Sequence, residues 1–133
     1  MNWIDDNVAL GGWLDSERHA TLQEGNIDLV IDARMLFRRK SSNPFQFEPI
    51  ADRILRAGDV LVATSNLQAK ALVHCVRGKD RTPFVASVYL SKKLAIPLGQ
   101  AYELVKLKHP HTVVHQDWIE LLQSSGHPTP THD

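Results

Sequence analysis

Cysteine is nearly absent from this chain, and charge of neither sign is in excess. The 133 residues contain a single cysteine, Cys75, so no disulfide can form within the chain and a reducing compartment is expected. Lys and Arg together number 15, as do Asp and Glu, which gives a formal net charge of +0. A neutral chain has no overall field that would draw it to nucleic acid or to a membrane surface. Any attraction for anions must therefore come from a local site.

Long apolar runs are also missing. No apolar stretch approaches the roughly 18 residues needed to cross a bilayer, and Met1–Asp6 has neither the basic nor the apolar region of a signal peptide. We therefore expect a cytoplasmic protein without stable membrane insertion and without a nucleic-acid partner. Residues 1–124 are expected to form one domain, which an apolar content of 43% can support. Residues 125–133 contain two prolines and one glycine and are expected to form a flexible tail.

The first half of the chain is typical of short strands alternating with helices. Apolar residues at 3–4 and 8–10 predict two strands joined by a turn, with Gly11–Gly12 ending the second. A helix is then expected from residue 15 or 16 to about 24, with Leu14 facing inward. Residues 27–32 predict a buried strand because their apolar run is nearly continuous. Residues 33–43, with four basic side chains, predict a loop at the end of that strand.

The second half continues with helices around one more strand. Pro44 is expected to open a helix whose buried face repeats at helical spacing through Ile50, Ile54 and Leu61. Residues 71–74 predict a strand, and helices are expected after Pro83, over 98–108 and around Trp118. This order predicts an α/β fold with a small, mostly parallel central sheet flanked by helices. In such sheets ligands bind at the carboxyl ends of the strands, so the loops after residues 32 and 74 could meet there.

The stretch Ala71–Thr82, ALVHCVRGKDRT, carries the chemistry. A loop that opens a helix directs its backbone N–H groups toward one centre, which a tetrahedral anion can occupy. Gly78 allows the backbone to approach that centre closely, and Arg81 can offer two oxygens a bidentate fork. The same groups would convert the Cys75 thiol to a thiolate near neutral pH. A thiolate in this position is a nucleophile.

Neighbouring residues support this reading of Cys75. The Thr82 hydroxyl can donate to the sulfur and make it a better leaving group, whereas His74 is better placed to brace the loop than to act as a base. The alternative is an inert buried thiol, which is a common state of single cysteines. A core cysteine, however, needs neither Gly78 nor Arg81, so we favour the nucleophile.

The motif His-Cys-x-x-Gly-x-x-Arg-Thr over residues 74–82 resembles the signature loop of the cysteine-dependent protein tyrosine phosphatase superfamily, and the chain looks most like a compact dual-specificity phosphatase. The resemblance implies hydrolysis of a phosphomonoester through a cysteinyl-phosphate on Cys75, with Arg81 binding the phosphate and the transition state, and no metal or other cofactor. It also implies a polar loop over 112–118 that lines the pocket through His115 or Gln116. The remaining residues of the phosphate-binding loop would be Val76, Arg77, Gly78 and Lys79.

The general acid does not occupy its usual place. The family's aspartate lies roughly thirty residues before the nucleophile, where it must reach the leaving oxygen; here residues 41–45 contain no carboxylate. Asp80 is our first candidate, because the run GKDRT resembles the loop of myotubularin-like lipid phosphatases and of some bacterial phosphatases, in which this aspartate is considered the acid. Its ordinary alternative is a salt link to a neighbouring basic residue. Glu48 is the second candidate, and Asp52 is more simply a solvated helix charge.

The resemblance leaves the substrate open. Dephosphorylation of phosphotyrosine and phosphoserine or phosphothreonine in proteins is the first expectation. Arg77, Lys79 and the basic residues of 34–40 could instead favour a phosphoinositide or inositol phosphate. A catalytically weak phosphate-binding module is the alternative from another class, because the usual acid loop is missing. The spacing of His109, His111 and His115 fits no metal-ligand set, so no metal site is expected.

Overall fold

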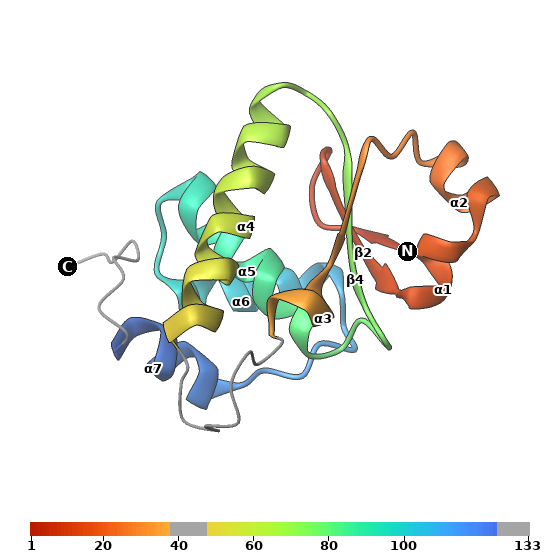
Figure 1. Cartoon of the computed structure of the whole chain (residues 1–133). Helices are drawn as coiled ribbons and strands as arrows, with labels where there is room; N and C mark the ends of the chain where they lie inside the picture. Colours follow the sequence, from red (N-terminus) through yellow and green to blue (C-terminus); the bar gives the residue numbers. More distant parts are fainter. Residues whose placement is uncertain (38–47, 125–133) are drawn as a thin grey trace.

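A computed structural model describes residues 1–37 and 48–124 of the chain, with backbone alone for residues 19, 48 and 49. The described residues form four strands and seven helices, with helices between β2, β3 and β4 and three more after β4 (Figure 1). The strands are β1 (Asn2–Trp3), β2 (Val8–Gly12), β3 (Leu29–Asp32) and β4 (Ala71–Cys75). The helices are α1 (Trp13–Glu17), α2 (His19–Glu24), α3 (Ala33–Leu36), α4 (Glu48–Asn66), α5 (Arg81–Leu94), α6 (Leu98–Lys108) and α7 (Gln116–Ser124).

The strands form one sheet in the order β1-β2-β4-β3. Strands β2 and β3 run parallel to β4, and β1 alone is antiparallel to its neighbour β2. The prediction of a small, mostly parallel sheet is thus confirmed. The register pairs Gly12 with Cys75 and Asp32 with His74, so the carboxyl ends of three strands meet at one edge. Ligand sites of such sheets form at this edge.

The sheet has helices on both sides. Figure 1 shows α4, α5 and α6 on one side of β2 and β4, and α1 and α2 on the other. Alternate residues of a strand point to opposite faces, and Ala71, Val73 and Cys75 accordingly belong to the core cluster that includes Val85 and Tyr89 of α5. The thiol therefore faces the helix that follows its own loop.

Helix α4 packs closely on α5 and is continuous through Gly58. A glycine inside a helix lowers its stability relative to alanine. A Cβ at Gly58, however, would lie 2.9 Å from Cγ1 of Val88, so the glycine lets α4 and α5 approach each other. Ile50, Ile54 and Leu61 are buried on one face, as their spacing predicted. The predicted start of this helix at Pro44 lies outside the described residues, as does the predicted tail over 125–133.

Several local predictions were wrong. Gly11 and Gly12 belong to β2 rather than ending it. The helix predicted from residue 15 or 16 to about 24 is two short helices, because Arg18 is extended between them (φ −92°, ψ 102°), and Leu14 is 51% exposed. The strand predicted as buried is β3, which lies at the sheet edge and exposes Val30. The loop predicted after it begins as α3, whose N-terminus the Asp32 carboxylate caps by accepting from the Arg34 N–H.

Within the described ranges, no helix has the length and apolar character that crossing a membrane requires.

Candidate active site

Cys75 ends the central strand β4 and is 4% exposed. Helix α5 begins at Arg81, so the five residues 76–80 turn the chain from a buried strand into a buried helix. The backbone N–H of Gly78 donates to the Cys75 sulfur at 3.2 Å. The described geometry thus brings Cys75 to the centre of a loop that opens a helix. Such a loop can bind a tetrahedral anion through its N–H groups.

Burial and hydrogen bonding oppose each other at this thiol. Burial raises the pKa of Cys75, whereas the Thr82 hydroxyl and the backbone N–H groups of Thr82, Gly78 and Asp80 lower it, and the pKa lies below that of an ordinary thiol. The Thr82 hydroxyl oxygen is fully buried and has no hydrogen-bond partner other than this sulfur among the described residues. The loop therefore favours the thiolate.

Gly12 of β2 and Gly78 of the loop let the loop lie against the end of the sheet. Gly78 adopts φ +70°, and a Cβ there would lie 2.7 Å from the Gly11 carbonyl oxygen. A Cβ at Gly12 would lie 2.9 Å from the Val76 carbonyl oxygen, which accepts the Trp13 N–H at 3.3 Å. Sequence reasoning missed this role of β2. The sequence feature that could have indicated it is the pair Gly11–Gly12, which predicted only the end of the strand.

The segment after α6 forms a second wall of the loop. The Val113 N–H donates to the Lys79 carbonyl at 2.8 Å, and Nε2 of His115 lies 2.7 Å from Oδ1 of Asp80. The His115 ring stacks on Trp118, with centroids 3.8 Å apart and planes inclined by 14°. The structure therefore brings His115 to the nucleophile loop. Gln116 begins α7 and is exposed.

Asp80 immediately precedes α5, with a half-exposed side chain. Its carboxylate is hydrogen-bonded to His115 at 2.7 Å, a contact that braces the loop against the segment after α6. Of the other carboxylates, Asp52 pairs with Arg56 at 2.9 Å within α4. Glu48 is the first residue of α4, and its side chain is not among those described.

The cationic side chains around the loop differ in their surroundings. Arg77, Lys79 and Arg81 are exposed, as is the apolar Val76. The Arg81 guanidinium lies over the Phe37 ring, 5.9 Å from its centroid.

Arg34 differs from these cationic residues because its charge is paired. Its Nε and Nη2 donate to the Asp32 carboxylate at 2.7–3.1 Å and lower the pKa of that carboxyl. Arg34 thus brings an ion pair, not an uncompensated charge, to the edge of the sheet.

His74 and the other histidines with described side chains are not part of a group of three or more metal ligands. His74 is buried in β4, and its Nδ1 has no hydrogen-bond partner among the described residues, so that atom does not brace the loop. Across residues 1–37 and 48–124, no group of three or more His, Cys, Asp or Glu side chains is arranged to hold a metal ion.

Comparison with known proteins agrees with this geometry. No family model matches the sequence. A protein-tyrosine-phosphatase of Arabidopsis thaliana, IBR5, is 25% identical over 124 residues, which is 90% of this chain and 48% of that protein. The tyrosine-protein phosphatase vhp-1 of Caenorhabditis elegans is 26% identical over 119 residues, covering 80% of this chain and 18% of its own. The chain thus spans about half the length of one relative and about a fifth of the other.

Solved phosphatase structures share the fold. Human DUSP28 superposes with a TM-score of 0.73 at 15% identity, over 93% of this chain and 90% of that one. DUSP15 gives a TM-score of 0.73 at 16% identity, over 95% and 90% of the two chains. The chain is thus similar in sequence to tyrosine phosphatases, and its fold is that of compact dual-specificity phosphatases. The predicted fold class and resemblance are therefore confirmed.

The lowered pKa of Cys75 can be tested in this phosphatase-like chain without a substrate. A lowered pKa keeps the thiolate present at pH values where an ordinary cysteine is protonated, so alkylation of Cys75 by iodoacetamide should persist toward acid pH. Thr82→Val should raise the pKa and slow alkylation about three- to tenfold on the acid side. Mass spectrometry of the alkylated peptide against pH measures both. Thr64→Val, in exposed α4 surface, is the matched control. A profile typical of free cysteine that Thr82→Val leaves unchanged would contradict the stabilised thiolate.

Proposed function

We propose that the protein is a phosphomonoester hydrolase of the dual-specificity type that acts through a cysteinyl-phosphate on Cys75. The observation that carries the proposal is the buried sulfur at the carboxyl end of β4, held by the Gly78 N–H at 3.2 Å and with a lowered pKa. A thiolate is a competent nucleophile at phosphorus. The same N–H groups that favour the thiolate would bind the equatorial oxygens of a phosphoryl group as charge spreads over them.

The reaction has two displacements at phosphorus. In the first, the Cys75 thiolate attacks, a sulfur–phosphorus bond forms, and the bond to the leaving oxygen breaks. In the second, water attacks the cysteinyl-phosphate, which releases inorganic phosphate and returns the thiolate. Arg81, exposed beside the loop, would hold two phosphoryl oxygens. The N–H groups around Cys75 and the buried Thr82 hydroxyl would stabilise the thiolate as it leaves.

Asp80 is the proposed proton donor in the first displacement. It lies inside the loop, which supports access to the leaving oxygen. His115 contacts it at 2.7 Å. His115 would hold the Asp80 carboxyl in place. That carboxyl would give its proton to the alcohol that departs and regain one from the water that attacks in the second displacement.

Phosphorylated proteins are the proposed substrates. The two curated relatives are tyrosine phosphatases by name, and the fold is shared with dual-specificity phosphatases, which together support phosphotyrosine with phosphoserine and phosphothreonine. One observation favours phosphoinositides or inositol phosphates as the second candidate: Arg77 and Lys79 are both exposed in the loop. The pairing of Arg34 with Asp32 weakens that candidate by compensating one of the charges expected at the rim.

Hydrolysis of an aryl phosphate tests the proposal directly. The unmodified protein should release the aryl alcohol and be inhibited by vanadate, and Cys75→Ser should lower kcat by on the order of a thousandfold or more because a hydroxyl is a far weaker nucleophile. Circular dichroism controls for folding of the variant.

If the unmodified protein shows no turnover at any pH, while phosphate still raises its thermal unfolding midpoint, the protein is a phosphate-binding module and not an enzyme. A panel of phosphopeptides and phosphoinositides then ranks the two substrate classes.

The acid role of Asp80 predicts a dependence on the leaving group. Asp80→Asn should slow hydrolysis of alkyl phosphates about a hundredfold, since their alkoxides need a proton, and slow aryl phosphates with acidic phenols less than about tenfold. The measurement is kcat/KM over a series of leaving groups. Asp117→Asn is the matched control, because Asp117 lies on the other side of His115, 3.9 Å from its Nδ1, and is 71% exposed. Equal losses on both substrate types would remove Asp80 from the proton transfer.

A further inference from the structure

His109 connects the first strand of the protein to the nucleophile loop. The Asn2 side-chain amide donates to Nδ1 of His109 at 2.7 Å, and Nε2–H of His109 donates to the Gly78 carbonyl at 2.6 Å. The N–H of Gly78 in turn donates to the Cys75 sulfur at 3.2 Å. Three hydrogen bonds thus lead from β1 to the sulfur. The first joins residues 107 positions apart in the chain, and the second joins residues 31 positions apart.

The partners fix the state of the imidazole. A side-chain amide nitrogen can only donate, so Nδ1 must carry a free lone pair and Nε2 the proton. The ring is therefore neutral, with both nitrogens satisfied. Burial lowers the pKa of His109, with smaller contributions in the same direction from His111 and the Met1 amino group, and the Gly78 carbonyl opposes them. The fixed tautomer of His109 and its exposure of only 7% are typical of a buried structural residue and not of a histidine that titrates at the surface.

The backbone of His109 is fixed as firmly as its ring. Its N–H donates to the Val105 carbonyl at 2.8 Å, and its carbonyl accepts from the Thr112 hydroxyl at 2.7 Å and the Thr112 N–H at 3.0 Å. Gly78, by contrast, is the loop residue with the most conformational freedom, and it sits at φ +70°. A fixed donor on the Gly78 carbonyl limits rotation of the residue whose N–H points at the sulfur.

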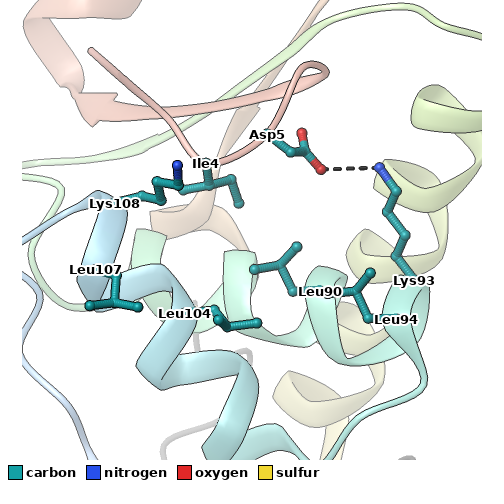
Figure 2. Close-up of a pocket in the computed structure, with 8 residues that line it drawn as sticks. All are labelled: Ile4, Asp5, Leu90, Lys93, Leu94, Leu104, Leu107 and Lys108. Atoms are coloured by element: carbon teal, nitrogen blue, oxygen red, sulfur yellow. Dashed lines mark hydrogen bonds and ion pairs between the residues drawn. The ribbon is translucent and has the colours of Figure 1, made fainter.

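An open apolar hollow lies near this connection. Ile4, just after β1, and Lys108, just before His109, border the hollow, which has a volume of about 250 Å³ and which α5 and α6 also line (Figure 2). In Figure 2 the polar contact drawn in this region is that of Asp5 with Lys93, which lies across the hollow from Lys108. Leu107 beside it is 77% exposed. The hydrogen bond from Asn2 therefore joins β1 to the residue that follows α6 next to a partly open region of the surface.

We propose that His109, oriented by Asn2, is a positioning residue that holds the Gly78 peptide so that the loop N–H groups converge on Cys75. The proposal rests on the proposed function for its effect on turnover, but its effect on the thiol is independent of turnover. Without the His109 donor, Gly78 should sample other conformations and the thiolate should lose part of its stabilisation.

The experiment compares His109→Leu, His109→Gln and His111→Leu. His109→Leu should move the alkylation profile of Cys75 toward alkaline pH and lower kcat for an aryl phosphate about ten- to hundredfold, since small misplacements of reacting groups cost about this much. His109→Gln, whose amide can still donate to Gly78, should restore most of both. His111→Leu should change neither, because His111 lies in the same loop but is exposed.

Asn2 variants provide a milder test should His109→Leu fail to fold. Asn2→Ala removes the donor to Nδ1 and lets the His109 ring take its other tautomer, so the Cys75 alkylation profile should move toward alkaline pH by less than in His109→Leu. Asn2→Asp should stay close to the unmodified protein, because an imidazolium that donates Nδ1–H to the carboxylate still donates Nε2–H to Gly78. A folded His109→Leu, or Asn2→Ala, with the Cys75 alkylation profile and kcat profile of the unmodified protein would overturn the proposal. A shifted alkylation profile in a protein that hydrolyses no phosphate would uphold His109 and reject the phosphatase instead.

Discussion

The hydrogen bond from the Gly78 N–H to the Cys75 sulfur is the interaction on which the site depends. For it to form, Gly78 must adopt a left-handed conformation against the Gly11 carbonyl, where no Cβ fits. Strand β4 must end at Cys75, and α5 must begin at Arg81, so that further N–H groups lower the pKa of the thiol. The end of the sheet at Gly12 and the segment after α6 each contact one side of this five-residue loop.

The position of Asp80, the proposed proton donor, inside the loop has a structural consequence. Asp80 is carried by the same segment as the nucleophile, so no separate loop has to close to bring the two together. The segment after α6 takes over the supporting role, since it contacts the loop at Gly78, Lys79 and Asp80. Under the proposed function, residues 75–82 would carry most of the chemistry, and residues 109–115 would fix its geometry.

The parts of the structure that depend on local sequence patterns could be predicted from the sequence. The strand, loop and helix around Cys75 follow from a short apolar run, a glycine and a proline, and the α4 face follows from its helical spacing. Sequence reasoning did not recover contacts between distant segments. The bond between Asn2 and His109 joins residues 107 positions apart, and neither residue has a local pattern that reveals it. The edge position of β3 was missed because an apolar run does not show how many neighbours a strand will have.

The most direct test of the account is to capture the covalent intermediate. Rapid acid quench during turnover of an aryl phosphate, followed by mass spectrometry of the peptide that contains Cys75, should find one phosphoryl group on the sulfur in the unmodified protein and none in Cys75→Ser. Turnover without any phosphorylated Cys75, or with the phosphoryl group on another residue such as His115, would contradict the account.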